Sequence, residues 1–261
     1  MCRWIAYHGE PIFIEEFVTI PEKSLLVQSR ASREAKSVVN GDGFGIGWYG
    51  ERPAPGVFRD LRPAWSDENL LSLAHQIKSG LFFAHVRAST GTAISRANCH
   101  PFVLGRWMFM HNGGIGEWEN VRRPIENGIP DTLFGHRSGT TDSEAIFLLL
   151  VANGLEKDPG RAFRKTIAQI EHVMAEAGVQ KPLRFTAAAT DGETIHAVRY
   201  STLIEPETLY LRQLKSRKGQ LIASEPYDDG RLDWEAVPAQ SHVILSRDDL
   251  RVEAFRPSLD G

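Results

Sequence analysis

The cysteine at position 2 stands directly behind the initiator methionine, in the segment Met1-Cys2-Arg3-Trp4. We expect Met1 to be removed, because the aminopeptidase requires a small second residue, and Cys2 then carries a thiol and a free α-amine on one carbon. An amine with a pKa of about 8 can accept the proton of a thiol with a pKa of about 8.5 near neutral pH. The position therefore predicts a nucleophile with its own general base. The alternative is an inert, structural cysteine in an N-terminal strand, which is the commoner role of this residue type.

Two polar clusters further along the chain could complete such a site. His85 and Arg87 end a predicted strand that breaks into small hydroxyl residues, Thr90 among them. An arginine at such a place can bind a carboxylate through two hydrogen bonds, although a structural ion pair is the commoner role for such an arginine taken by itself. Later, an apolar strand runs into Asn112 and Gly113, whose side-chain and backbone N–H groups can stabilise an oxyanion. A simple Asn-Gly turn would use the same two residues.

Two other clusters have a structural interpretation. Cys99 and His100 are adjacent, but no second pair stands at a zinc-like spacing, so we expect no metal site. The segment 40–50 contains five glycines. In a dinucleotide-binding loop such glycines lead into a helix, whereas here Gly43, Gly45 and Gly47 alternate and lead into a strand. The pattern therefore predicts a turn followed by a closely packed strand.

These residues must be positioned by strands near both ends of the chain and by helices in its middle. Short segments rich in β-branched and aromatic residues predict strands over 3–7, 45–49, 81–87, 106–111, 183–189, 194–200, 208–214, 220–223 and 242–245. Apolar residues at helical spacing predict helices over 67–77 and 160–177. The run Thr141-Asp142-Ser143-Glu144 is typical of a capping box and predicts the start of a third helix. This order favours two packed sheets with helices outside them.

The composition is that of a globular protein. The 261 residues carry a formal net charge of −3 and are 42% hydrophobic, which allows a substantial core. No stretch is long and apolar enough to span a membrane and no signal segment opens the chain, so we expect a cytoplasmic location. Scattered basic residues argue against nucleic-acid binding. With two cysteines and no obvious linker, we expect a single domain over residues 2–261 without a disulfide framework.

The motifs follow one another in a specific order. They are Met-Cys at the start, His-x-Arg at 85–87, Asn-x-His-Pro at 98–101, His-Asn-Gly at 111–113 and Thr-Asp-Ser-Glu at 141–144. Together they resemble the glutaminase domain of class II glutamine amidotransferases, which are N-terminal nucleophile hydrolases. Ala-Ser-Glu-Pro at 223–226 is similar to a late segment of the stand-alone members, and we expect no synthase domain. The resemblance implies an α+β fold, a four-layer αββα sandwich of two mainly antiparallel sheets flanked by helices.

The resemblance also implies roles for individual residues at the reacting bond. Cys2 is the nucleophile, with its α-amine as the general base. Asn112, through its side chain, and Gly113, through its backbone, stabilise the tetrahedral oxyanion. The residues implied to support this machinery are His85, Asn98, His100 and His111.

A second set of implied roles concerns the amino-acid head of the substrate. Arg87 binds the α-carboxylate of glutamine, helped by Thr90 or its backbone neighbours, and Asp142 binds the α-ammonium. One cation and one anion suit a zwitterionic head group, although an acid beside a helix N-cap is also favoured for structural reasons. Ala88 stands where synthase-linked members have an aromatic residue. One wall of the substrate site should therefore differ from theirs.

We expect hydrolysis of the side-chain amide of glutamine, or of a related γ-glutamyl compound, through a thioester on Cys2. The small-molecule substrate would yield glutamate and ammonia or an amine, and the chemistry needs no cofactor. Two alternatives stay open: a partner-dependent subunit that delivers ammonia to a separate synthase, and a non-catalytic binding protein that retains the fold. A synthase partner or a homo-oligomer is compatible with the sequence.

Overall fold

A computed structural model describes residues 2–34, 39–89, 91, 93–203, 205–215, 218–228, 233–247 and 249–260. One group of strands consists of β1 (Arg3–Phe13), β2 (Phe44–Trp48), β3 (Gly56–Asp60), β4 (Lys78–Val86), β9 (Tyr210–Leu214), β10 (Gly219–Ala223) and β11 (Glu235–Ala236). They form a seven-stranded sheet in the order β11-β9-β10-β1-β4-β2-β3. Neighbouring strands in this sheet pair antiparallel.

The second sheet has six strands. They are β5 (Phe102–Leu104), β6 (Trp107–Gly114), β7 (Arg184–Thr190), β8 (Ile195–Ser201), β12 (Ser241–Leu245) and β13 (Leu250–Ala254). Their order is β13-β12-β8-β7-β6-β5, and these pairs are also antiparallel.

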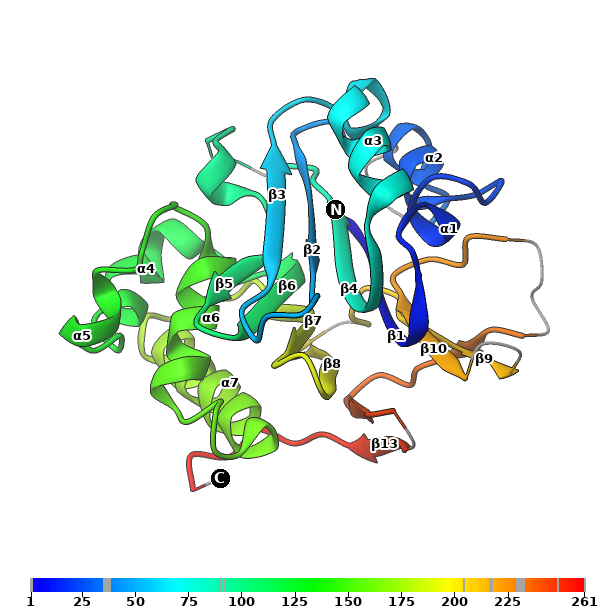
Figure 1. The fold of residues 1–261 in the computed structure, drawn as a ribbon. Helices are drawn as coiled ribbons and strands as arrows, with labels where there is room; N and C mark the ends of the chain where they lie inside the picture. Colours follow the sequence, from blue (N-terminus) through cyan, green and yellow to red (C-terminus); the bar gives the residue numbers. More distant parts are fainter. Residues whose placement is uncertain are drawn as a thin grey trace.

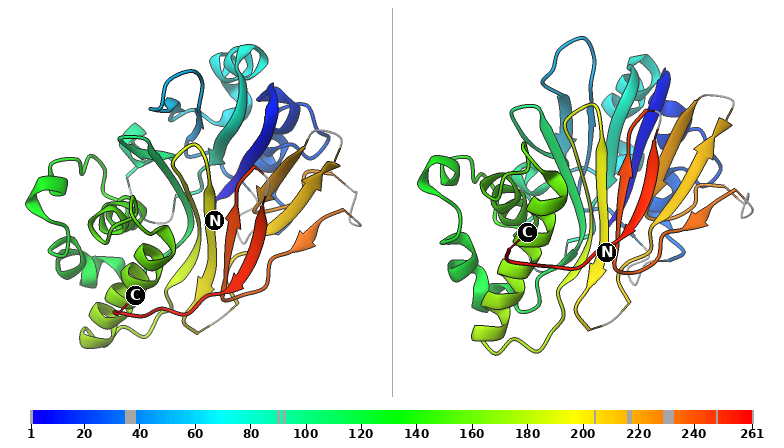
Figure 2. Two further views of the ribbon diagram at one scale, coloured as in Figure 1. Left: turned by 60° about the horizontal axis from the view of Figure 1, so that its bottom comes forward. Right: turned by 90° about the horizontal axis from the view of Figure 1, so that it is seen from below.

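The helices lie on the outer faces of the two sheets (Figures 1 and 2). Over the first sheet lie α1 (Glu15–Val18), α2 (Leu25–Arg30) and α3 (Glu68–Gln76). The green helices over the second sheet are α4 (Trp118–Glu126), α5 (Asp131–Phe134), α6 (Asp142–Ala152) and α7 (Pro159–Glu176). Single 3-10 turns are η1 (Ala64–Ser66) and η2 (Arg96–Asn98). None of these helices in the described ranges is long and apolar enough to cross a membrane.

The side chains along each strand alternate between the two faces of its sheet, and this alternation separates the cores of the protein. In β1, Ile5 and Tyr7 pack with the helices α1 to α3, whereas Trp4 and Ala6 lie with Met110 of β6 in the core between the sheets. Successive side chains of a strand point to opposite faces, so one strand serves both cores. A third core joins the other face of the second sheet to α4, α6 and α7. The predicted α+β sandwich of two antiparallel sheets with outer helices is therefore confirmed.

The glycine-rich segment behaves as its pattern predicts. It ends in β2, whose inner face lies close to the strand β6 and to the residues before β5. A Cβ atom at Gly45 would lie 2.1 Å from the carbonyl oxygen of His100, and one at Gly47 would lie 2.5 Å from the sulfur of Met108. The glycines are needed for this close approach.

All nine predicted strands and all three predicted helices are present; β1 ends six residues later than predicted, and the other predicted boundaries lie within three residues of the observed ones. The sequence did not predict β3, β5, β11 or β13, nor the helices α1, α2, α4 and α5. β13 is an edge strand whose last four residues are exposed, and β5 is three residues long. Short or exposed elements have little apolar periodicity to detect.

Candidate active site

The two sheets bring Cys2 and Asn112 together. Cys2 precedes β1 by one residue and continues the row of Trp4 that faces the second sheet, and Asn112 continues the inward row of Met110 in β6. The backbone nitrogen of Cys2 donates a hydrogen bond of 3.1 Å to Asn112 Oδ1. The amide oxygen is thereby occupied, so the remaining group of Asn112 is a donor. Its Nδ2 is buried and makes no hydrogen bond within the described part of the chain.

Gly113 occupies a position that no other residue type fits. Its φ is +151°, and a Cβ atom there would lie 2.0 Å from the carbonyl oxygen of Arg184 and 2.8 Å from His111 Nε2. A side chain would therefore force β6 away from β7 at the point where the strand reaches the site.

Cys2, Asn112 and Gly113 open onto a cavity of about 650 Å³. The thiol of Cys2 donates to the carbonyl oxygen of Ala88, with a sulfur–oxygen distance of 3.8 Å. Burial raises the pKa of the thiol, and the positive charges of Arg87 and Arg3 oppose this. At neutral pH the thiol is protonated, so attack on a carbonyl requires a base nearby.

Arg87 reaches the same cavity from the end of β4. Its guanidinium donates to the carbonyl oxygens of Asp42 (3.4 Å) and Ala93 (3.4 Å) and to Ser89 Oγ (3.3 Å). The carboxylate of Asp42 in turn accepts the Ser89 N–H at 2.7 Å, which fixes the turn after the strand. Sequence reasoning did not single out Asp42, although it stands in the Asn-Gly-Asp-Gly turn. Thr90, predicted to help Arg87, lies outside the described residues.

Asp142 reaches the cavity as the first residue of α6. Its Oδ2 accepts the backbone N–H of Ile115 at 2.9 Å, and its Oδ1 accepts that of Ser143 at 2.7 Å. Thr141 caps the helix by accepting the N–H of Glu144. An anion at a helix N-terminus is also favoured by the helix dipole. The structure thus places the cationic Arg87 and the anionic Asp142 on the cavity that holds the thiol.

Comparison with known proteins identifies the family. The sequence profile of class-II glutamine amidotransferases matches residues 18–245. The chain belongs to this family. It is 33% identical to the probable glutamine amidotransferase DUG3 of Saccharomyces cerevisiae, over 95% of this chain and 82% of that protein. It is 30% identical to the γ-glutamyl-hercynylcysteine sulfoxide hydrolase of Mycolicibacterium smegmatis, over 95% of this chain and 96% of that enzyme.

Solved structures agree with this assignment. The class-II glutamine aminotransferase domain protein of Silicibacter pomeroyi superposes with a TM-score of 0.79 at 37% identity, covering 98% of this chain and 100% of that one. Glutamine phosphoribosylpyrophosphate amidotransferase of B. subtilis shares the fold, with a TM-score of 0.62 at 13% identity. The predicted resemblance to class II amidotransferases, with their N-terminal nucleophile hydrolase fold, is confirmed.

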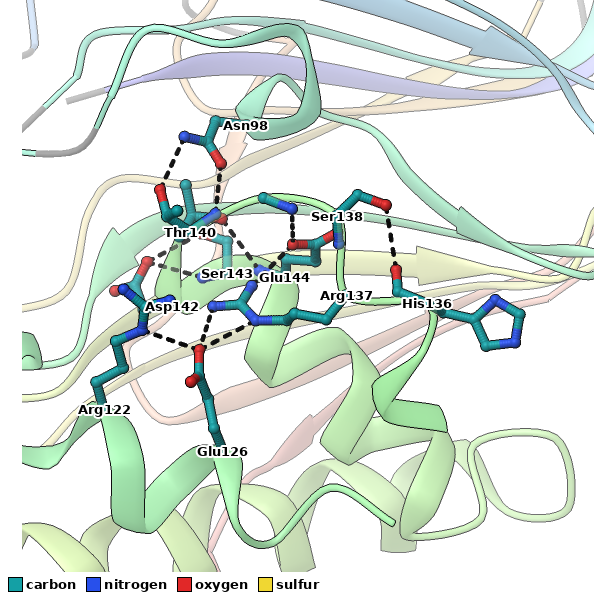
Figure 3. A network of polar contacts seen from close by, with 12 residues as sticks. Asn98, Arg122, Glu126, His136, Arg137, Ser138, Thr140, Asp142, Ser143 and Glu144 are labelled. Atoms are coloured by element: carbon teal, nitrogen blue, oxygen red, sulfur yellow. Dashed lines mark hydrogen bonds and ion pairs between the residues drawn. The ribbon is translucent and has the colours of Figure 1, made fainter. Parts of the chain in front are cut away.

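The loop before α6 of this amidotransferase is held by a buried ionic network (Figure 3). The capping box is only half formed, because Glu144 directs its carboxylate to the N–H groups of Ser138 (3.0 Å) and Gly139 (2.7 Å). Arg137 donates to Glu144 at 2.8 Å and to Glu126 of α4 at 2.7 Å. The sequence pattern identified Glu144 but not Arg137 and Glu126, which lie outside the motif. The network fixes the backbone that leads to Asp142.

Three histidines surround the site, and all are more than nine-tenths buried. The rings of His85 and His100 are in contact, with centres 4.2 Å apart and planes tilted by 32°, and His111 Nδ1 lies 2.9 Å from Ser143 Oγ. Burial lowers the pKa of His85 to about 3 and lowers those of His100 and His111 as well. The three rings are neutral at pH 7, so they add no charge to the site.

The other predicted site residues lie in or near this cavity. Those that line it are Cys2, Arg87, His100, His111, Asn112, Gly113 and Asp142. His85 and Asn98 are buried behind the lining, against His100 and Thr140 respectively. The lining side chains that the sequence did not predict include Trp118, Lys181 and Arg184. Trp118 begins α4, Arg184 begins β7 and Lys181 lies in the loop before β7, all outside any recognised motif.

Proposed function

We propose that this amidotransferase hydrolyses the side-chain amide of glutamine or of a γ-glutamyl conjugate through a thioester on Cys2. The observation that carries the proposal is the orientation of Asn112. Its oxygen accepts from the nitrogen of Cys2, and its Nδ2, which makes no hydrogen bond within the described residues, is left as a donor on a residue that lines the same cavity as Cys2. One side chain can thus position the base and stabilise the oxyanion.

The first half of the reaction forms the thioester. After Met1 has been removed, the α-amine of Cys2 takes the thiol proton, and the thiolate attacks the γ-carbonyl carbon. Asn112 Nδ2 and the Gly113 N–H stabilise the oxyanion. The tetrahedral intermediate then collapses, the carbon–nitrogen bond breaks, and the α-ammonium of Cys2 gives its proton to the departing amine.

The second half of the reaction hydrolyses the thioester and regenerates the free Cys2 thiol. Water loses a proton to the same α-amine and attacks the thioester carbonyl, and the carbon–sulfur bond breaks. The thiolate recovers its proton, and glutamate leaves. The sum is amide plus water giving acid plus amine, with no oxidation or reduction, so no cofactor is needed. In both halves, Arg87 and Asp142 hold the α-carboxylate and α-ammonium of the glutamyl group.

The size of the cavity favours a conjugate over free glutamine. At about 650 Å³ it lies in the range of about 300–1,000 Å³ that accommodates drug-sized ligands. Beyond the side chains needed for a glutamyl head, the lining offers one aromatic, two cationic and two anionic side chains: Trp118, Lys181, Arg184, Glu117 and Glu119. One relative is named for cleavage of a large γ-glutamyl compound, which agrees with this reading.

A substrate panel tests the proposal. Purified protein, shown by intact mass to lack Met1, is assayed for glutamate release from glutamine, γ-glutamyl dipeptides and γ-L-glutamyl-p-nitroanilide. We expect release from at least one of them without any partner protein, and none from Cys2→Ala. Activity that survives in Cys2→Ala would sink the nucleophile assignment. Ammonia release that requires a second protein would favour the synthase-subunit alternative.

A further inference from the structure

Asn98 is a fully buried amide that connects two loops behind the cavity (Figure 3). Its Nδ2 donates to the carbonyl oxygen of Ala93 at 2.9 Å and to Thr140 Oγ1 at 3.1 Å. Its Oδ1 accepts the backbone N–H of Thr140 at 2.8 Å. Three of the four hydrogen bonds available to an amide are thereby made, at full burial, so the side chain has one orientation.

One end of this connection reaches Arg87. The carbonyl oxygen of Ala93 accepts from Asn98 and also from Arg87 Nη2, at 3.4 Å. The same oxygen is therefore held by the buried amide and helps to hold the guanidinium. A shift of Ala93 would move the charge that lines the cavity.

The other end reaches Asp142. Thr140 lies two residues before Asp142 and directly before the helix cap Thr141. Both its backbone N–H and its hydroxyl are bonded to Asn98. The next loop residue towards the N-terminus, Gly139, is packed so closely that a Cβ atom there would lie 2.3 Å from Asn98 Oδ1. The start of α6 is thus anchored to the amide.

We propose that Asn98 is a positioning residue that sets the separation of Arg87 and Asp142, and so selects substrates with a carboxylate and an ammonium on one carbon. This inference rests on the proposed function, in which those two side chains bind the glutamyl head. Arg87 ends a strand of one sheet and Asp142 starts a helix over the other, so their separation depends on packing between layers. Binding groups must be held to within about 0.5 Å to be productive.

A merely structural amide makes a different prediction. Loss of a buried hydrogen-bonding side chain would lower stability and slow the hydrolysis of every substrate by a similar factor. Loss of a positioning residue affects only substrates that use both charges. The ratio of two substrates that differ in one charge therefore separates the two roles.

The test compares γ-L-glutamyl-p-nitroanilide with glutaryl-p-nitroanilide, which lacks only the α-ammonium and has the same leaving group. In the wild-type protein we expect the ratio of their kcat/KM values to be about 10–100, the effect of one hydrogen-bonded charge. In Asn98→Ala the ratio should fall at least fivefold, mainly through a higher KM for the glutamyl substrate. Asn153→Ala is the matched control, because Asn153 also donates to a threonine hydroxyl at 3.0 Å but lies between α6 and α7.

The possible outcomes test the positioning role of Asn98 as follows. A ratio that stays at the wild-type value in Asn98→Ala, with both substrates slowed equally, would overturn the positioning role and leave the proposed function intact. If wild-type protein cleaves neither anilide, the panel of glutamine and γ-glutamyl dipeptides decides whether the proposed function itself fails. If the panel shows that another substrate is cleaved, its KM should rise at least fivefold in Asn98→Ala while kcat stays within threefold of wild type. An unchanged KM for that substrate would overturn the positioning role. If Asn98→Ala does not fold, Thr140→Val replaces it, with a fall in the ratio of at least twofold expected.

Discussion

Replacement of Asn112 by alanine should reveal the oxyanion donor. Its Nδ2 is buried, and Asn112 lines the same cavity as Cys2. In such a site a neutral donor facing a developing negative charge contributes about 2.7–4 kcal/mol. We therefore expect kcat to fall by about 10²–10³, with KM changed by less than threefold. The lost hydrogen bond between Oδ1 and the Cys2 nitrogen adds about 0.5–1.5 kcal/mol, because the base is then less well positioned. Activity above that of Cys2→Ala should remain, since Gly113 keeps its backbone N–H.

The assay follows p-nitroaniline release from γ-L-glutamyl-p-nitroanilide under saturating and limiting substrate, or glutamate release if another substrate of the panel is preferred. Asn112→Asp is the shape-preserving companion, because it keeps an oxygen for the Cys2 nitrogen and replaces only the donor. It should lose at least as much kcat as Asn112→Ala, since a carboxylate repels the oxyanion. The control reaction is the alkylation of Cys2 by iodoacetamide, measured by intact mass, because no oxyanion forms in it. Its rate should therefore stay within about tenfold of wild type.

Two results would refute this reasoning. A kcat reduced less than tenfold in both Asn112 variants would mean that the side chain does not stabilise the transition state. A loss of alkylation rate as large as the loss of kcat would mean that the substitution disturbs the thiol rather than the oxyanion. Either result would leave Gly113 and the fold unaffected and would require a different oxyanion donor.

Four further outcomes are expected. Asp142→Asn should raise KM for glutamyl substrates about 10- to 100-fold with little change in kcat, and an unchanged KM would contradict its role at the α-ammonium. Protein that retains Met1, identified by intact mass, should be inactive. The pH dependence of the alkylation of its Cys2 should have a midpoint above pH 8.5, because burial raises the pKa of the thiol. A lower midpoint would contradict the raised pKa. Gly45→Ala should lower the free energy of unfolding by about 1–3 kcal/mol, whereas Gly50→Ala, with open space around it, should change it little; equal urea midpoints would refute the close packing of β2. Burial lowers the pKa of His85 to about 3, against about 6.5 in an unfolded chain, so the unfolded state binds more protons between these values. From pH 7 to pH 5 this histidine should therefore cost about 2 kcal/mol of stability, and a urea midpoint that is flat over this range would be contrary evidence.

The sequence predicted those functional residues that stand in short, recognisable motifs. The position of Cys2, the Asn112-Gly113 end of β6 and the start of α6 are short motifs whose residue types have few explanations, and all three lie on one cavity. Long apolar strands and helices were also predictable, since their periodicity extends over several residues. The alternation of Trp4 with Ile5 already separates the two faces of β1, although it does not say which face carries the second sheet.

Other parts of the site depend on distances between layers, which no single segment encodes. Glu126 at the end of α4 pairs with Arg137 of the loop before Asp142, and Trp118, Lys181 and Arg184 enter the cavity from segments without a motif. These contacts exist because antiparallel pairing and sheet-on-sheet packing bring together residues that are far apart in the chain.

The separation between local and tertiary information is clearest at the nucleophile. The sequence alone determined that Cys2 could be a nucleophile with its own base, because an N-terminal thiol and amine share one carbon. Only the tertiary structure decided that the amide of Asn112, 110 residues away, accepts the Cys2 N–H with its oxygen and leaves Nδ2 without a partner among the described residues. That choice follows from the packing of β1 against β6, since the inward row of each strand ends at the same edge of the core.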